Sequence, residues 1–347
     1  MHRTFRYTYR RIHLFSHCGI RVYKAPGLSF QRLVSYKAIA RSAVQLFNPK
    51  KKEVDFFTFS FIRRHRMADA EYEPGSEAAA GILNDLRGRI ASDAVLLERS
   101  EELGLNIGDI RDSITAASQT AGAGEVVLIA VSKLKPASDI LSLHTASAQR
   151  DFGENYIQEL WKKHAILPNT IRWHFIGGLQ TSAISKLARV ENLQAVHSID
   201  SVKKAVALNR LRPEGFAGVD VFVQVNTSGE DSKSGVEPDG EELWDLVATI
   251  RRECPRLNLV GLMTIGAIAR SQAVKEGEEN EDFVTLVRVA RAVEERIEKE
   301  DGVKVVLKLS MGMSDDYENA IAMGAGYVRV GSSIFGARPK KADATIL

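Results

Sequence analysis

The chain has 347 residues, 44% of them hydrophobic, and its two cysteines, Cys18 and Cys254, are far too few for a disulfide framework or a cysteine-rich zinc site. No apolar run approaches the roughly 20 residues that a membrane-spanning helix needs. The formal net charge of +3 averages a basic leader with an acidic body, and an acidic body argues against a nucleic-acid groove, which needs clustered cations.

Residues 1–66 differ in composition from the rest of the chain. They hold 15 of the 47 basic residues but only two acidic ones, which leaves 32 basic and 42 acidic residues and a net charge of −10 for residues 67–347. An arginine-rich, acid-poor leader is typical of a mitochondrial transit segment, although this one lacks a clear 3.6-residue apolar stripe. The alternative is that synthesis starts at Met67. We therefore treat 1–66 as a basic N-terminal extension, disordered or targeting, and 67–347 as the folded domain.

A helical segment is predicted ahead of eight strands. Ser76–Ala121 should form one or two helices, interrupted near Gly104–Gly108, that cap the domain. From Glu125 onward, short apolar runs rich in β-branched residues alternate with polar turns and helical patterns. The predicted strands are Val126–Ser132, Arg150–Gly153, Arg172–Ile176, Ala195–Ile199, Val219–Asn226, Leu257–Thr264, Val303–Ser310 and Tyr327–Val330.

The alternation of strands and helices predicts an α/β barrel. The amphipathic stretches between strands include Asn155–His164, Leu179–Val190, Glu241–Arg252 and Asp282–Lys299. Such alternation implies parallel strands, and the unbroken apolar run Val126–Val131 is typical of a strand buried on both faces. Eight units indicate a single closed (β/α)8 TIM-type barrel. A doubly wound open sheet is the alternative, but no Gly-x-Gly-x-x-Gly follows the first strand.

The first strand is followed by a lysine suited to hold a cofactor covalently. Active sites of such barrels lie at the carboxyl ends of the strands, and Lys133 directly follows the strand Val126–Ser132. Burial and a neighbouring cation such as Arg329 would both lower the pKa of this amine and leave it free to attack an aldehyde. The alternative is a lysine at the strand edge whose ammonium group reaches solvent.

Three further polar residues lie on or after the second, third and fourth strands. Asn155 either belongs to a simple turn or orients the Lys133 imine or the hydroxyl group of a pyridine cofactor. His174 and His197 show no His-x-His spacing and no nearby pair of acids. We therefore expect structural roles for both histidines rather than metal binding or general-base catalysis.

The loops after the seventh and eighth strands predict a phosphate site. Barrels often bind phosphate there through backbone N–H groups and a helix N-terminus. Gly312 and Gly331 allow the backbone to approach closely, and Ser314 and Ser332 add hydroxyl donors.

Each of these loops also has a simpler explanation. Ser314 is the predicted N-cap of a helix that begins at Asp315, and Gly331 could merely turn the chain. Both loops at the expected positions favour phosphate binding. Because Asp315 and Asp316 would put negative charge near the anion, both side chains should point outward.

Arg329 on the eighth strand bears on the type of cofactor. A lysine Schiff base opposite a phosphate site suggests pyridoxal 5'-phosphate, whose pyridine nitrogen needs a partner. An acid there would keep the nitrogen protonated and make the ring a strong electron sink. An arginine is always charged and can only donate, so it leaves the nitrogen unprotonated and is poorly suited to stabilise a carbanion. The alternative is an arginine in a salt bridge with a neighbouring acid.

Seven stretches between about residue 80 and Arg338 form an ordered set of motifs. They are Ala130–Lys133, Arg150–Tyr156, Trp173–Gly177, Gln224–Glu230, Gly261–Gly266, Ser310–Asp316 and Val328–Gly336. Together they closely resemble the pyridoxal phosphate homeostasis protein family. The sequence departs at Gly178, where many members have histidine, so a role for a histidine at that position is left open.

The resemblance implies a barrel like the N-terminal domain of alanine racemase, with pyridoxal 5'-phosphate on the lysine that matches Lys133. It also implies a phosphate against Ser314, Gly331 and Ser332 and a pyridine nitrogen against Arg329. Members of the family look like cofactor carriers or buffers without an established catalytic activity. The predicted cofactor-binding set is Lys133, Asn155, Ser314, Arg329, Gly331 and Ser332.

A pyridoxal-phosphate-dependent amino-acid racemase or decarboxylase is the alternative function. Racemisation on the related barrel needs the lysine and a tyrosine from a separate C-terminal domain. Only nine residues follow Arg338 in this sequence, so we expect an exposed cofactor without a second base. With Arg329 at the pyridine nitrogen, this favours a cofactor carrier over an enzyme. A scaffold that has lost the cofactor is disfavoured because Lys133, Arg329 and both phosphate loops are present.

The predicted carrier regulates intracellular pyridoxal 5'-phosphate and has neither catalytic nor metal-binding residues. Its expected partners are pyridoxal 5'-phosphate and apo-enzymes that depend on it, not nucleic acid or a membrane. We expect a monomer in the cytoplasm, or in mitochondria if residues 1–66 are a transit segment.

Overall fold

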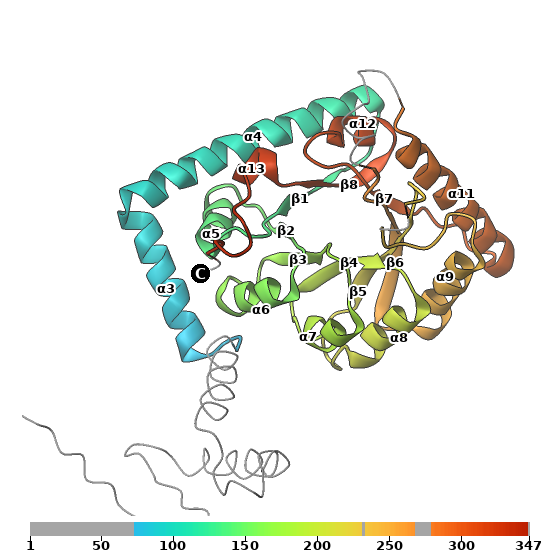
Figure 1. Cartoon of the computed structure of the whole chain (residues 1–347), viewed down its shortest axis with the longest axis horizontal. Coiled ribbons are helices and arrows are strands. Elements are labelled where there is room, and N and C mark those ends of the chain that lie inside the picture. The colour runs from blue at the N-terminus through green and yellow to red at the C-terminus, as the bar shows by residue number, and fades with distance from the viewer. Residues whose placement is uncertain (1–72, 231–232, 268–278, 346–347) are drawn as a thin grey trace, which may run out of the picture. The chain divides into compact units, whose positions relative to one another are not determined.

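The strands close into a barrel. The computed structural model describes residues 73–230, 233–267 and 279–345, so the predictions for residues 1–66 lie outside the described residues. Eight parallel strands pair in chain order from β1 to β8, and β8 pairs with β1 (Figure 1). The predicted (β/α)8 barrel is confirmed, and the open-sheet alternative is wrong.

Each predicted strand has its counterpart at the expected place. The strands are β1 Val127–Val131, β2 Asp151–Glu154, β3 Arg172–Phe175, β4 Leu193–Ile199, β5 Val219–Gln224, β6 Leu257–Met263, β7 Lys308–Ser310 and β8 Ala325–Val330. The seventh strand is much shorter than predicted. Val303 and Val306 are 51% and 76% exposed, so these side chains face water in the segment that leads into β7.

The helices alternate with the strands and cover the outside of the barrel. They are α3 Glu77–Ser92, α4 Ala94–Ala121, α5 Ala137–Ala146, α6 Ile157–Ile166, α7 Ile184–Leu187, α8 Val202–Leu211, α9 Glu241–Glu253, α11 Glu281–Asp301, α12 Tyr317–Ala322 and α13 Ser332–Phe335. The predicted helix Leu179–Val190 is reduced to the 3-10 turn Thr181–Ala183 followed by α7. The long helix α4 packs against α5, α12 and α13 (Figure 1).

The N-terminal helices are interrupted at Asp93, not near Gly104–Gly108 as predicted. The Asp93 carboxylate accepts hydrogen bonds from the N–H groups of Val95 and Leu96 and so caps α4. The glycines stay inside α4 because Leu103 and Ile107 beside them are fully buried. Tertiary packing therefore outweighs the low helix propensity of glycine.

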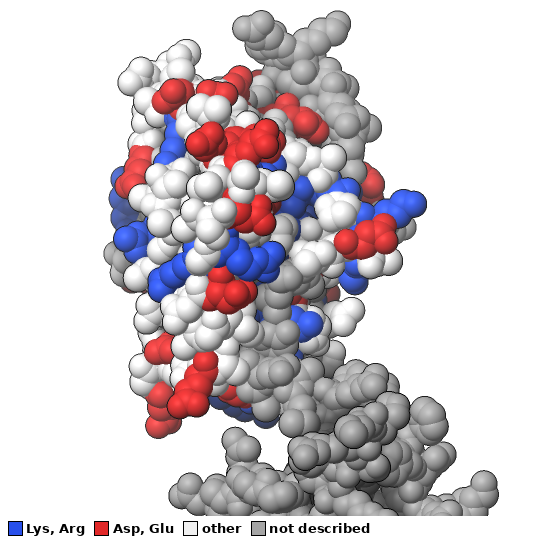
Figure 2. All heavy atoms as spheres, turned by 90° about the vertical axis from the view of Figure 1, so that its left-hand side faces the viewer, with Lys and Arg blue, Asp and Glu red and all other residues white. Residues whose placement is uncertain are grey.

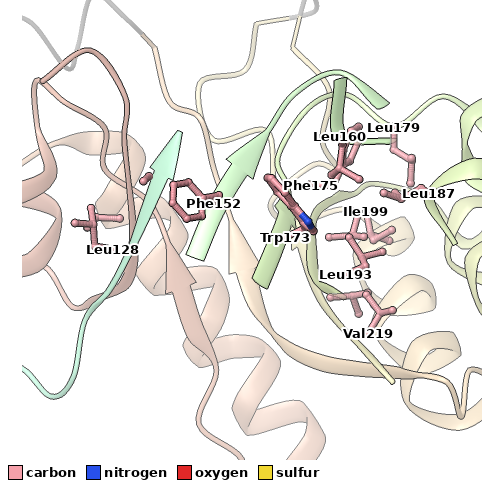
Figure 3. Packing of buried hydrophobic residues seen from close by; sticks show 14 of the residues in the cluster. Leu128, Phe152, Leu160, Trp173, Phe175, Leu179, Leu187, Leu193, Ile199 and Val219 are labelled. Carbon is pink, nitrogen blue, oxygen red and sulfur yellow. The ribbon is translucent and has the colours of Figure 1, made fainter. Parts of the chain in front are cut away.

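The core fills the space between the strands and the surrounding helices (Figure 3). Leu128, Phe152 and Trp173 come from three successive strands, and the rings of Phe152 and Trp173 lie 6.2 Å apart. All four residues of β2 are buried, as expected for a parallel strand with both faces covered. This packing fixes the positions from which the carboxyl ends of the strands present polar residues.

None of the described helices combines the length and the apolar character needed to cross a bilayer. On the face shown in Figure 2, basic and acidic side chains are interspersed rather than gathered into one large area of a single sign.

Candidate functional site

Lys133 lies two residues beyond the end of β1, at the carboxyl end of the barrel, as predicted. Its side chain is partly buried. Among the described residues it has no hydrogen bond or ion pair. Burial lowers the pKa of the Lys133 amine, the cations Arg338 and Arg329 lower it further, and Glu154 partly opposes them. The Lys133 amine therefore loses its proton more readily than the amine of an ordinary surface lysine.

The loops after β7 and β8 meet at Ser314 and Gly331. The Ser314 hydroxyl oxygen accepts a hydrogen bond from the Gly331 N–H at 3.2 Å. Ser332 is exposed and Gly331 is buried at the start of α13. At Gly312 the backbone has a φ of +89°, and a β-carbon there would lie 2.6 Å from that of Ala320, so only glycine fits.

Two expectations about this loop are wrong. Ser314 does not cap a helix, because α12 begins at Tyr317 and Asp316 is the residue before it. Asp315 is exposed as expected, but Asp316 is buried. The Asp316 carboxylate turns inward because it accepts a hydrogen bond from the Met313 N–H at 2.6 Å.

Arg329 is a buried cation held by neutral groups. Its Nη1 donates to the Ser310 hydroxyl and its Nη2 to the Thr264 carbonyl, each at 2.9 Å. Burial lowers the pKa of the guanidinium to about 10, with Asp316 opposing the shift, so it stays charged at neutral pH. The predicted alternative of a salt bridge is wrong, since Arg329 forms none with the described residues. Its Nε–H and two further N–H hydrogens have no partner there.

A line of hydrogen bonds runs from Ser310 through the barrel interior. Ser310 Oγ lies 2.9 Å from His197 Nδ1, His197 Nε2 lies 3.0 Å from His174 Nδ1, and His174 Nε2 lies 2.9 Å from Asp151 Oδ1. Burial, followed by the charges of His174 and Arg329, holds the pKa of His197 well below its usual value. One donor direction, from the Ser310 hydroxyl through His197 and His174 to Asp151, gives every atom of this line a partner, because the Asp151 carboxylate can only accept.

Ser310 Oγ contacts both Arg329 and His197, and His174 contacts His197 in turn. The two histidines therefore help to position Ser310, which accepts a hydrogen bond from Arg329. Burial alone would raise the pKa of Asp151, but hydrogen bonds from His174 and Arg172 lower it.

Within the ranges that the structure describes, no three histidine, cysteine or acidic side chains are grouped so that they could hold a metal ion.

Sequence similarity identifies the family. Residues 105–339 match the family model described as "Alanine racemase, N-terminal domain". The Schizosaccharomyces pombe protein named "Pyridoxal phosphate homeostasis protein" is 43% identical over 221 residues, which cover 64% of this chain and 88% of that protein. The chain belongs to the pyridoxal phosphate homeostasis protein family. The resemblance of the seven motifs is thereby confirmed.

Two solved structures resemble the barrel of this chain. The structure of PipY from Synechococcus elongatus with pyridoxal phosphate bound is 28% identical, covers 67% of this chain and 100% of PipY, and has a TM-score of 0.52. An alanine racemase from Clostridium difficile is 11% identical, covers 70% of this chain and 58% of the racemase, and has a TM-score of 0.51. At that low identity the racemase shows only that the fold is shared.

Several residues around the site carry no local sequence signal. Ser310 supports Arg329 from another strand, and Glu159 and Lys163 on α6 contact the backbone on either side of Lys133. Each of these contacts joins segments at least 19 residues apart, so hydrophobic periodicity and turn chemistry could not predict them. Asn155, which was predicted, has a buried side-chain oxygen without a partner among the described residues.

Proposed function

We propose that this family member binds pyridoxal 5'-phosphate as a Schiff base on Lys133 and serves cofactor homeostasis as a carrier, without a robust catalytic activity. The observation that carries the proposal is the pairing of Lys133, with its lowered pKa, and Arg329, with its unused N–H groups. The PLP-bound structure of PipY supports it. When bound, the cofactor supplies an electrophilic imine and a conjugated ring.

The remaining predicted residues fit the other parts of the cofactor. We propose that Ser314, Gly331 and Ser332 contact the phosphate, since the Ser314–Gly331 hydrogen bond joins the two loops. A β-carbon at Gly331 would lie 3.6 Å from Nη2 of Arg338, so a cation borders this position. The unpartnered oxygen of Asn155 can accept a hydrogen bond, which suits the cofactor's hydroxyl group.

Arg329 favours a carrier over a racemase or decarboxylase. A guanidinium beside the pyridine nitrogen opposes protonation of that nitrogen and so weakens the ring as an electron sink. Ser310 and Thr264 accept hydrogen bonds from Arg329, so the guanidinium is held in place and cannot move away from a protonated pyridine nitrogen. We infer that the recipients are apo-enzymes that depend on pyridoxal 5'-phosphate.

An absorbance spectrum, taken before and after borohydride reduction and followed by peptide mapping, tests the central proposal. We expect an imine band and a reduced label on Lys133. Lys133→Ala should remove both while the circular dichroism spectrum stays unchanged, and Lys304→Ala, at an exposed lysine, should change neither. A label that persists in Lys133→Ala would assign the cofactor to another lysine, and no band after added cofactor would refute binding.

Arg329→Glu tests the proposal that the guanidinium limits catalysis by keeping the pyridine nitrogen unprotonated. A carboxylate at this position should keep the pyridine nitrogen protonated and restore the electron sink. We expect measurable exchange of the α-hydrogen of an added amino acid in deuterated water, followed by nuclear magnetic resonance. Arg329→Gln, which is neutral, is the matched control and should gain none. The absence of any gain in a folded, cofactor-loaded Arg329→Glu would contradict this explanation.

A further inference from the structure

The turn that presents Lys133 contains a backbone conformation that leucine rarely adopts. Leu134 has a φ of +60°, and Ala148 is the only other non-glycine residue with a positive φ in the described ranges. A side chain with a β-carbon is disfavoured in this left-handed region. Such a conformation persists only where surrounding contacts impose it.

Two residues of α6 hold the backbone on both sides of Lys133. The Glu159 carboxylate accepts a hydrogen bond from the Leu134 N–H at 2.8 Å. One helical turn later, Lys163 Nζ donates to the Ser132 carbonyl at 2.9 Å. The two peptide groups that flank Lys133 are therefore fixed by one helix.

Glu154 at the end of β2 completes the cluster. Its Oε1 accepts hydrogen bonds from Lys163 Nζ at 2.7 Å and from the Ser132 hydroxyl at 2.6 Å. Lys163 Nζ also lies 3.2 Å from Glu159 Oε2. The side chains of Lys163 and Glu154 are fully buried, and that of Glu159 is 5% exposed. The three N–H hydrogens of Lys163 are thus all used, whereas Glu154 Oε2 has no partner among the described residues.

Stability alone is a weak reason for this arrangement. A buried ion pair often contributes no more than apolar side chains of the same size would, because its desolvation is costly. Here the contacts converge on the residues before and after Lys133. The charged groups that act on Lys133 are the cations Arg338 and Arg329 and the carboxylates Glu154 and Glu159, and burial raises the pKa of Glu154.

We propose that Glu159, Lys163 and Glu154 form an ionic clamp that positions Lys133. The clamp holds residue 134 in its left-handed conformation, so that the Lys133 side chain leaves the barrel rim in one direction, and it places two carboxylates against the cations around the amine. This inference rests on the proposed function of Lys133 and adds its positioning residues.

Two substitutions of Glu159 separate the hydrogen bond from the charge. Glu159→Gln keeps an oxygen that can accept from the Leu134 N–H but removes the charge, whereas Glu159→Ala removes both. One measurement is the rate at which pyridoxal 5'-phosphate is trapped on Lys133 by borohydride, at a pH above the pKa of Lys133 in every variant. A second is competitive labelling with acetic anhydride, without cofactor, which gives the pKa of Lys133 relative to the exposed Lys304.

Both variants should lower the pKa of Lys133, because each removes a negative charge near the amine. The trapping rate of Glu159→Gln should stay within about threefold of the wild type. That of Glu159→Ala should fall by about tenfold or more, the factor expected when a hydrogen bond to a charged group is lost. Circular dichroism checks that each variant is folded.

Two further variants test the backbone and the lysine of the clamp. In the Glu159→Ala background, Leu134→Gly should raise the trapping rate again, because glycine accepts a positive φ without strain. Lys163→Met should change the labelling of Lys133, whereas Lys162→Met on the same helix should not. Equal trapping rates for folded Glu159→Gln and Glu159→Ala, or no recovery with Leu134→Gly, would overturn the clamp.

The proposed function and the clamp fail in different ways. If the wild type forms no Schiff base, the proposed function fails, but anhydride labelling still reports on the clamp. If the pKa of Lys133 is the same in the wild type, Glu159→Gln and Lys163→Met, the clamp is refuted whether or not the cofactor binds.

Discussion

Acid should destabilise the fold through His164, which neighbours Lys163 on α6. Its imidazole is 5% exposed, its ring centroid lies 4.9 Å from that of Trp161, and its Nε2 has no hydrogen-bond partner among the described residues. Burial lowers the pKa of His164 to about 4. In the unfolded chain the same group has an ordinary pKa near 6.5. Between about pH 4 and pH 6.5, unfolding is therefore accompanied by uptake of a proton at His164.

The direction and size of the effect follow from these two pKa values. The stabilising contribution is complete well above pH 6.5 and is lost as the pH falls toward 4. At pH 5, His164 alone should lower the free energy of unfolding by about 2 kcal/mol relative to pH 8, and its effect should level off at about 3.4 kcal/mol well below pH 4. The size of this loss equals the free-energy cost of protonating the buried His164 imidazole beside Trp161 in the folded state.

Urea unfolding followed by circular dichroism at pH 5 and pH 8 measures this loss. In His164→Phe, a planar ring remains against Trp161 but cannot titrate, so between the two pH values this variant should lose about 2 kcal/mol less than the wild type. His144→Phe is the control, since that imidazole is partly exposed and its desolvation costs less. If the wild type and His164→Phe lose equal free energy, His164 does not couple protonation to unfolding.

Two further predictions concern the supports of the cofactor site. Ser310→Ala removes the acceptor for Arg329 Nη1, and because a hydrogen bond to a charged group contributes about 1.5–3 kcal/mol, spectroscopic titration should show at least roughly tenfold weaker cofactor binding. Unchanged affinity would mean that Ser310 does not position Arg329. Gly177→Ala would place a β-carbon 2.1 Å from the carbonyl oxygen of Asn155 and should lower both the melting temperature and the affinity. Gly178→Ala, which meets no atom within 4 Å, should change neither, and equal effects would contradict the steric argument.

The parts of the structure that could be predicted depend on neighbours in sequence. A strand buried on both faces requires a continuous apolar run, and Val126–Val131 provides one in full. Once eight such strands are parallel, their carboxyl ends must meet at one end of the barrel, which brings Lys133 and Arg329 to the same end. The predicted cofactor-binding set therefore rests on strand order together with the family resemblance, and the contacts of its members with a cofactor stay predictions.

The parts that could not be predicted depend on partners far along the chain. The interruption at Asp93 was missed because two glycines inside α4 are a stronger local signal than one capping carboxylate. Ser314 has the sequence position of a helix cap but bonds to Gly331, 17 residues later. Leucine is not a residue type that suggests a left-handed backbone, and the Leu134 N–H donates to Glu159, 25 residues away.

Arg329 shows how the structure narrows what the sequence left open. A buried cation is costly unless it is paired, yet the groups that hold this one are a hydroxyl and a carbonyl, with no carboxylate in ion-pair contact among the described residues. Neutral acceptors take two of its five N–H hydrogens and leave three without a partner among the described protein atoms. The lone pair of an unprotonated pyridine nitrogen is such an acceptor, and a carboxylate is not needed beside it. Under the proposed function, ligand binding rather than the stability of the barrel accounts for the cost of burying Arg329.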